Sequence, residues 1–258
     1  MPLIRERLLD LFNAQGFTVQ VGHMTAFWYD NHNVNAFRDC ASLWHNGHRF
    51  GAGWGMPWAE LTLLEWLGDV WQPATIYGIG NAFGWSTVAL RLAFPFARLV
   101  SIDSGAEGHE GKNGIDLTNH ILSGLGHGGE VVLATSPGDV PATAARLGGP
   151  INLAFVDGLH TEMQQRIDYD AIRPFLAPDH IILFHDVLFM KLDPRPEVNR
   201  LENGFWEIAK DYPDRAAILS RTTTGIGCVW SPGMDYVGQR LRRMWVQPEV
   251  PDSLGKVR

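Results

Sequence analysis

The sequence predicts an α/β fold built on a doubly wound, mostly parallel seven-stranded sheet. From residue 74 onward, short apolar runs alternate with amphipathic stretches, which is the pattern of βα units. The first of these runs passes through a glycine turn into a helix, and later runs end in acidic residues. The 258 residues and the hydrophobic content of 45% suit one such domain with an extension.

The segment before the sheet, residues 1–72, is expected to be a helical and irregular cap. A first helix is expected to end at Gly16, and a second is expected over 57–67. The part between them is rich in tryptophan and histidine and shows no regular period. Most of its aromatic residues are expected to pack in the interior, although Trp28, Tyr29 or Trp54 could cover a flat acceptor.

The sheet and its helices are expected over residues 73–231. The expected strands are 75–79, 98–102, 130–134, 151–156 and 180–184. The expected helices are 86–94, 115–125, 140–147, 161–173 and 201–212. Two last apolar runs, 216–220 and 225–230, are too close for a crossover helix, so they predict an antiparallel hairpin at the sheet edge. Residues 232–258 are expected to form a loosely held tail with solvated arginines.

Composition disfavours several classes of protein. A net charge of -7 leaves no excess of cations to neutralise nucleic-acid phosphates, so a small-molecule acceptor is expected instead. No apolar run reaches the length of a membrane span or of a signal-peptide core, which predicts a cytoplasmic protein with no membrane partner. Cys40 and Cys228 belong to no Cys-x-x-Cys motif, so neither a zinc knuckle nor a disulfide framework is indicated. A homo-oligomer is left open, because the Trp-rich segment could equally be a subunit interface.

The glycine turn after residue 77 is the first candidate ligand site. Glycines at 78, 80 and 84 let the backbone approach a ligand, and the helix that follows presents free N–H groups. Their spacing departs from the dinucleotide fingerprint G-x-G-x-x-G, which disfavours NAD. Alone, the turn is equally compatible with a purely structural role. Asp103 ends the next apolar run, nineteen positions after Gly84, where a carboxylate can bind a ribose diol. Together these features indicate an adenosine-containing ligand.

The fourth and fifth expected strands end in Asp157 and in His185-Asp186. Parallel neighbouring strands lie about 4.8 Å apart, so these carboxylates would repel unless one is protonated or a cation lies between them. Asp157, His185 and Asp186 are therefore a candidate octahedral site for Mg²⁺ or, because of the imidazole, a transition metal. The equal alternative is a core histidine beside a turn-capping aspartate. His160 is a candidate base for an acceptor hydroxyl, or simply an exposed residue at a helix start.

These stretches together resemble the class I S-adenosylmethionine-dependent methyltransferases, which have a Rossmann-like fold. More narrowly, they resemble the small-molecule O-methyltransferases related to those that finish macrolide, aminocoumarin and cephamycin antibiotics. The matching stretches are 78–87, 100–103, 154–160 and 183–187, in the family's order. Two positions depart from the family pattern: many relatives carry an acidic residue where Gly78 stands, and an acidic or amide residue where His185 stands.

The resemblance implies S-adenosylmethionine as cofactor and O-methylation of a small-molecule hydroxyl, with or without a divalent metal. The implied cofactor residues are Gly78, Gly80, Asn81, Gly84, Ser86, Thr87, Asp103, Ser136 (or Thr135) and Asp157. The implied catalytic residues are Asp157, His160 and Asp186, and the implied metal ligands are Asp157, His185 and Asp186. The acceptor pocket is expected from residues 17–71 and 190–203.

Two alternatives to a methyltransferase stay open. The first is an NAD- or sugar-nucleotide-dependent enzyme on a similar sheet, although the short-chain dehydrogenase form would need a Tyr-x-x-x-Lys pair. The second is a non-catalytic module that keeps the fold and binds a cofactor or partner without turnover.

Overall fold

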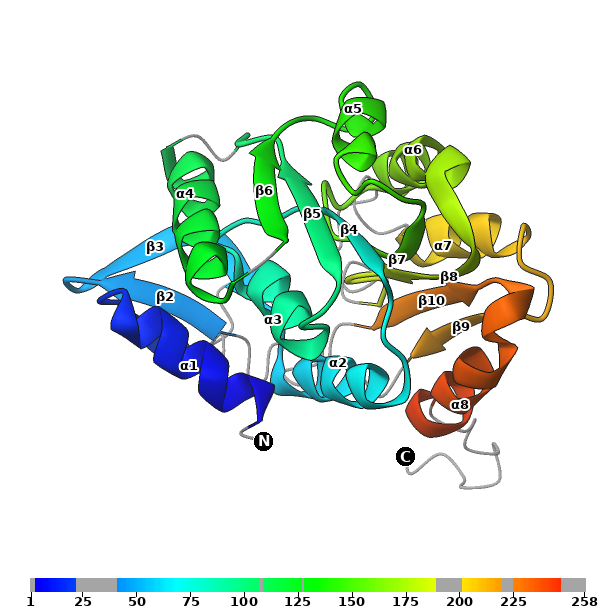
Figure 1. Cartoon of the computed structure of the whole chain (residues 1–258), viewed down its shortest axis with the longest axis horizontal. Helices are drawn as coiled ribbons and strands as arrows, with labels where there is room; N and C mark the ends of the chain where they lie inside the picture. Colours follow the sequence, from blue (N-terminus) through cyan, green and yellow to red (C-terminus); the bar gives the residue numbers. More distant parts are fainter. Residues whose placement is uncertain are drawn as a thin grey trace, which may run out of the picture.

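The core of the protein is a seven-stranded sheet flanked by helices, seen in a computed structural model that describes residues 3–21, 41–106, 109–126, 128–188, 201–219 and 225–246 (Figure 1). The strand order is β6-β5-β4-β7-β8-β10-β9. The strands are β4 (Thr75–Ile79), β5 (Arg98–Asp103), β6 (Gly129–Leu133), β7 (Ile151–Val156), β8 (Leu176–Phe184), β9 (Ala216–Leu219) and β10 (Ile226–Trp230). The first five in this order are parallel, and β10 is antiparallel to both β8 and β9. The predicted sheet and its antiparallel hairpin are confirmed.

Helices cover both faces of this sheet (Figure 1). One side carries α1 (Ile4–Ala14), α2 (Trp58–Val70), α3 (Trp85–Ala93) and α4 (His109–Gly124). The other carries α5 (Val140–Ala145), α6 (Glu162–Ile172) and α7 (Leu201–Ala209). Each side has its own core of buried side chains, with Leu64 and Leu90 in the first and Tyr169 and Phe205 in the second. No helix of the described residues is both long enough and apolar enough to span a bilayer.

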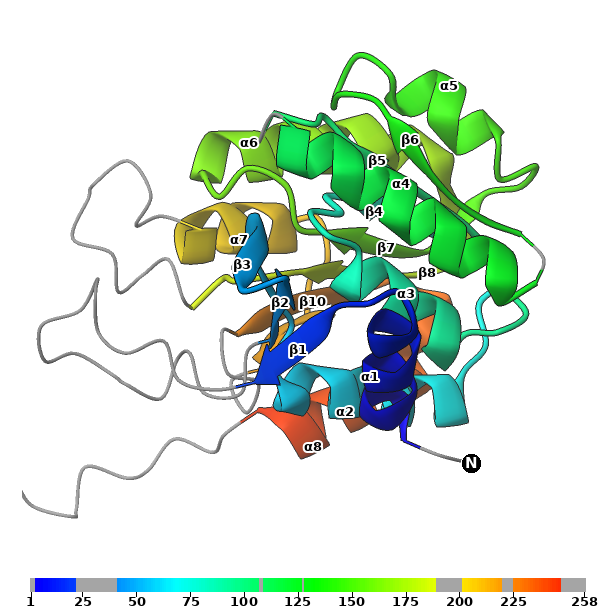
Figure 2. The ribbon, with the colours of Figure 1, turned by 90° about the vertical axis from the view of Figure 1, so that its left-hand side faces the viewer.

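The cap is more regular than its sequence suggested. It holds an antiparallel three-stranded sheet, β1-β2-β3, formed by β1 (Thr18–Val21), β2 (Ala41–His45) and β3 (His48–Gly55). Figure 2 shows this sheet beside α1. Asn46 and Gly47 form the two-residue turn between β2 and β3, with φ of 49° and 78°. Asn-Gly is the preferred pair for such a turn, so these residues favour the hairpin of β2 and β3. The expectation of an irregular cap did not include this hairpin.

The chain after β10 also differs from the expected loose tail. Residues Asp235–Trp245 form helix α8, which packs near β9 and β10. Two of its arginines are engaged: Arg242 donates a hydrogen bond of 2.6 Å to the Ala216 carbonyl and stacks over Trp230, and Arg240 stacks over Trp66. Arg243 is exposed. Stacking of guanidinium groups on indole rings favours this ordered arrangement.

Some sequence predictions fall outside the described residues or stay untested. Trp28, Tyr29, Cys40 and residues 190–200 lie outside the described ranges, and the boundaries at residues 72 and 231 stay predictions. Cys228 is fully buried in β10, and burial raises the pKa of its thiol far above the ordinary value. Its thiol is therefore structural and unreactive.

Candidate functional site

The carboxyl ends of the parallel strands form one edge at which the expected site residues begin. Ile79, the last residue of β4, pairs with Ile102 of β5 and with Val156 of β7. The backbone hydrogen bonds between neighbouring strands continue one residue beyond the strand ends. Gly80 N–H donates to the Ile102 carbonyl, and Asp157 N–H donates to the Ile79 carbonyl, each at 2.8 Å. The glycine loop and the ends of β5 and β7 therefore meet at one place, where open α/β sheets bind ligands.

Two glycines of the loop have a backbone that other residues adopt at a cost. Gly80 and Gly84 both have φ of 93°. A Cβ at Gly80 would overlap the Asp157 carbonyl oxygen, and a Cβ at Gly84 would overlap the Thr118 hydroxyl. Both positions therefore require glycine, for conformation and for close approach. The loop is held against β7 on one side and against α4 on the other.

Asp103 shapes this loop directly. Its Oδ2 accepts hydrogen bonds from the backbone N–H groups of Asn81, at 2.8 Å, and Ala82, at 3.0 Å, while Oδ1 accepts one from Gly105 at 2.8 Å. A carboxylate offers about four lone-pair sites, so these three bonds leave capacity for one further donor. The sequence predicted a ribose-binding acid here but not a clamp on the glycine loop.

Asn81 ties the loop to α4. Its Nδ2 donates to the Ala82 carbonyl at 3.0 Å and to the Thr118 hydroxyl at 3.1 Å. Its Oδ1 is buried without a hydrogen-bond partner among the described residues. A buried acceptor without a donor is costly, so this oxygen fits a ligand that brings a donor.

The other expected cofactor residues, Gly78, Ser86, Thr87 and Ser136, are buried or half-buried. Gly78 lies within buried strand β4, where an added Cβ would overlap the Ser101 hydroxyl, so no side chain fits at this position. The side chains of Ser86 and Thr87 are buried in the first turn of α3. Ser136 is half-buried beyond the end of β6.

A compact group of carboxylates and imidazoles lies at the ends of β7 and β8. His185 Nδ1 lies 3.1 Å from Asp157 Oδ1 and 3.2 Å from Asp186 Oδ1. Its Nε2 lies 2.6 Å from Oε2 of Glu60, a fully buried residue of α2. His160 Nε2 lies 3.4 Å from Asp157 Oδ1 and 3.7 Å from Asp186 Oδ2. The carboxylates of Asp157 and Asp186 are thus each flanked by two imidazole rings.

Local geometry brings these side chains together. Thr161 is the N-cap of α6, and its hydroxyl accepts a hydrogen bond from Gln164 N–H, which fixes the start of the helix just after His160. Asp186 has φ of 61°, a left-handed backbone that is uncommon outside glycine. Such strain is concentrated at functional sites.

The charges of this group stabilise one another. Burial alone would raise the pKa of both carboxyls, but the charge of His185 and the hydrogen bonds around it hold the pKa values of Asp157 and Asp186 below their usual range. Burial opposes the imidazolium form of both histidines, yet the surrounding carboxylates raise the pKa of His160 and raise that of His185 further. These pKa shifts favour a charged imidazole beside the two carboxylates, which counters the repulsion expected between Asp157 and Asp186.

The role of His185 as a metal ligand stays a prediction, and the contacts of its ring do not favour it. Both of its ring nitrogens face carboxylates, so neither is free to face a cation shared with Asp157 and Asp186. His160 stands there instead, because ligand atoms of Asp157, His160 and Asp186 all lie within 4.8 Å of one another. Glu60 was not predicted from the sequence. Its only signal is a helical spacing that puts this acid on the same face as Leu64 and Leu67.

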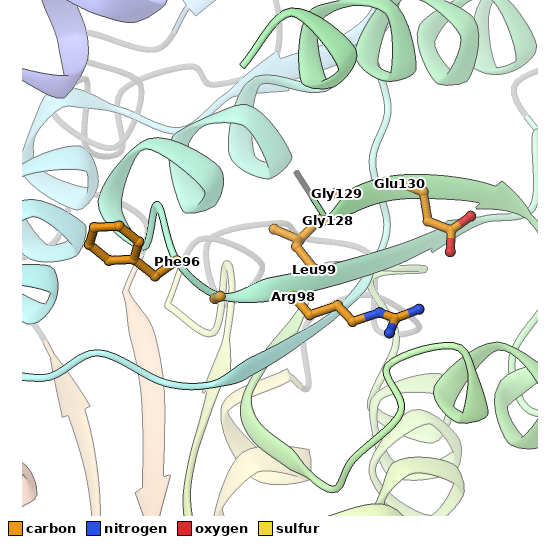
Figure 3. Close-up of a pocket in the computed structure, with 7 residues that line it drawn as sticks. Phe96, Arg98, Leu99, Gly128, Gly129 and Glu130 are labelled. Carbon is orange, nitrogen blue, oxygen red and sulfur yellow. The ribbon is translucent and has the colours of Figure 1, made fainter. Parts of the chain in front are cut away.

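A surface pocket lies at the opposite edge of the sheet (Figure 3). It is lined by Phe96, Ala97, Arg98, Leu99, Gly128, Gly129 and Glu130, around the amino ends of β5 and β6. Glu130 is already paired with Arg146, with an Oε1–Nε distance of 2.9 Å. The lining offers no group of catalytic side chains, so the chemistry is assigned to the carboxyl edge.

The sheet order, the glycine loop after its first core strand and the acid after its second define the class I S-adenosylmethionine-dependent methyltransferase fold. Residues 78–187 match the family model of a methyltransferase domain. No curated protein matches the chain in sequence.

Solved structures share this fold. One is an O-methyltransferase from Bacillus cereus in complex with SAH, with 14% identity, 90% of this chain and 92% of that chain covered, and a TM-score of 0.52. Another is the SAH-bound methyltransferase PaMTH1 from Podospora anserina, with 17% identity, 67% and 78% covered, and a TM-score of 0.51. Residues 78–187 are therefore similar to a methyltransferase domain, and the chain shares the fold of these two solved structures.

Proposed function

We propose that this protein transfers the methyl group of S-adenosylmethionine to a hydroxyl oxygen of a small molecule, and that it does so in the cytoplasm. The observation that carries the proposal is the layout of the carboxyl edge, where the loop Gly80–Gly84 and Asp103 lie beside the group of Asp157, His160 and Asp186. The Bacillus cereus protein with the same fold is an O-methyltransferase.

The proposed cofactor site uses the features that the loop leaves available. Counting the hydrogen bonds of the described residues, Asp103 has one acceptor position left for a ribose hydroxyl, and Asn81 Oδ1 lacks a donor. The first N–H groups of α3, at Trp85, Ser86 and Thr87, have no carbonyl partner within the helix and favour a negatively charged or acceptor group. Ser136, past the end of β6, is the proposed neighbour of the adenine.

In the proposed reaction, an oxygen lone pair of the acceptor forms a bond to the methyl carbon. The sulfur–carbon bond breaks, its electron pair stays on sulfur, and the hydroxyl proton leaves. The protein's main task is to align the oxygen with the methyl carbon, which lowers the barrier by several kcal/mol (about 7–11 in the best oriented reactions). The carboxylates of Asp157 and Asp186 orient the hydroxyl, and His160 in its neutral form accepts the proton and becomes an imidazolium that these carboxylates stabilise.

A divalent cation fits the same group. Two carboxylates and one imidazole with ligand atoms within 4.8 Å are a donor set for a transition metal or Mg²⁺ with added oxygen ligands. Asp157, His160 and Asp186 would hold the cation, and His160 would have to lose its proton first. When bound, the cation would acidify and orient the acceptor hydroxyl.

Asp186→Asn tests this site with little disturbance of the backbone, because asparagine tolerates the left-handed conformation at φ of 61°. We expect methyl transfer to fall by about a hundredfold or more, as for loss of a group that takes part in proton transfer. The affinity for S-adenosylhomocysteine should stay within severalfold of the wild-type value. The assay follows labelled methyl groups from S-adenosylmethionine into a panel of hydroxylated small molecules, with Mn²⁺, with Mg²⁺ and with chelator.

Asp179→Asn is the matched control, since Asp179 lies exposed toward the other end of the same strand, β8. It should leave methyl transfer unchanged. Full activity of Asp186→Asn would remove Asp186 from the mechanism, and full activity in chelator would remove the metal. Methylation of amines or carbon acids, with no hydroxyl product, would contradict O-transfer.

A further inference from the structure

Glu60 is a fully buried acid, and the cost of burying its carboxylate requires a compensating partner. It lies in α2 among buried leucines, and none of its surface is exposed. A buried carboxylate is strongly unfavourable unless it is paired and hydrogen-bonded. Its Oε2 lies 2.6 Å from His185 Nε2, across 125 residues of sequence. This contact joins the N-terminal cap to the carboxyl edge of the central sheet.

The partner of Glu60 is the ring that organises the candidate site. The other nitrogen of His185 contacts the carboxylates of both Asp157 and Asp186. Phe155 packs against the imidazole with ring centroids 5.7 Å apart. Rotation of this ring would break the contact with Glu60 and both contacts with the aspartates. The orientation of the two carboxylates toward His160 therefore depends on the His185 ring, which Glu60 contacts at Nε2.

We propose that Glu60 is a positioning residue of the candidate site: it holds His185 Nε2 and thereby fixes the imidazole whose Nδ1 orients Asp157 and Asp186 toward His160. The inference deepens the proposed function and rests on it for the chemistry that the two aspartates perform. It also assigns a role to α2 in the active site, since this cap helix supplies the far end of the Glu60–His185–aspartate chain. Outer partners of this kind commonly orient catalytic or metal-binding groups.

The test compares the wild-type protein with Glu60→Gln and with Asp69→Asn. Glutamine keeps the size of glutamate but removes its charge. Asp69→Asn likewise replaces a carboxylate by an amide of the same length, at an exposed position of the same helix. Crystal structures give the Asp157–His160 and Asp186–His160 distances, and the EPR spectrum of bound Mn²⁺ reports the ligand geometry. Calorimetry with S-adenosylhomocysteine and thermal unfolding report the cofactor loop and the fold.

We expect Glu60→Gln to turn at least one of the two aspartates away from His160, and to weaken Mn²⁺ binding at least tenfold with a broadened EPR spectrum. Its affinity for S-adenosylhomocysteine should stay within twofold of wild type. Asp69→Asn should match the wild-type protein in every measurement. If Glu60→Gln keeps the wild-type distances and Mn²⁺ spectrum, the positioning role is refuted.

Two further outcomes are informative. If Glu60→Gln does not fold, His185→Asn breaks the same series of side-chain contacts at its middle residue. The same distances and Mn²⁺ spectrum then test the positioning role. If wild-type protein binds no S-adenosylhomocysteine, the proposed function fails. The positions of Asp157 and Asp186 in the Glu60→Gln crystal structure would still support or overturn the positioning role.

Discussion

Gly80→Ala is expected to destabilise the protein and to weaken its binding of S-adenosylhomocysteine strongly. Alanine at φ of 93° costs about 1–2 kcal/mol, and its Cβ would in addition overlap the Asp157 carbonyl oxygen. The clash is with backbone that is itself hydrogen-bonded to Ile79, so it cannot be relieved by a rotamer change. We expect a loss of at least about 2 kcal/mol in the free energy of unfolding.

The affinity should fall by about a hundredfold or more, which corresponds to a further ~2.7 kcal/mol. Chemical denaturation and calorimetry measure the two effects. Gly124→Ala is the control, because Gly124 lies in α4 with no atom within 4 Å of an added Cβ and no positive φ. Alanine there should be neutral or slightly stabilising. Near wild-type binding in Gly80→Ala would mean that the loop does not hold the cofactor.

Asp103→Ala is expected to weaken binding of S-adenosylhomocysteine by about 10–100-fold, since a hydrogen bond to a charged group contributes about 1.5–3 kcal/mol. The substitution removes the proposed ribose acceptor and also the three backbone hydrogen bonds that shape the loop. Asp103→Asn keeps one acceptor oxygen, so its affinity should lie between those of Asp103→Ala and wild type. Calorimetry measures both variants.

Asp116→Asn is the matched control for this change, since Asp116 is exposed on α4. It should bind S-adenosylhomocysteine as the wild-type protein does. If Asp103→Ala lowered stability but left the affinity unchanged, Asp103 would be a clamp on the loop and not a ligand of the cofactor.

Much of the core could be predicted from the sequence, because each feature was encoded locally. The apolar runs that became β4, β5 and β7 are short and continuous, as buried parallel strands require. The glycine loop and Asp103 were recognisable because ligand-binding turns in this architecture need glycine and an acid at fixed places. The last two runs were read as a hairpin from the shortness of their connection, and β9 and β10 pair in that way.

The features that were missed depend on contacts between distant segments. The cap sheet joins β1 to β2 across residues 22–40, and only the Asn46-Gly47 turn marked it locally. Helix α8 depends on stacking against aromatic residues of other elements. The sequence places His185 at the end of a strand but does not show the carboxylates that lie against both of its ring nitrogens. Glu60 lies 125 residues away in sequence, so no local pattern could connect the two.

Calorimetric titration of the wild-type protein with S-adenosylhomocysteine, with NAD in a parallel cell, tests the central claim most directly. We expect one binding site per chain for S-adenosylhomocysteine and no heat of binding for NAD. Binding of NAD without binding of S-adenosylhomocysteine would refute the proposed methyltransferase and favour a dinucleotide-dependent enzyme.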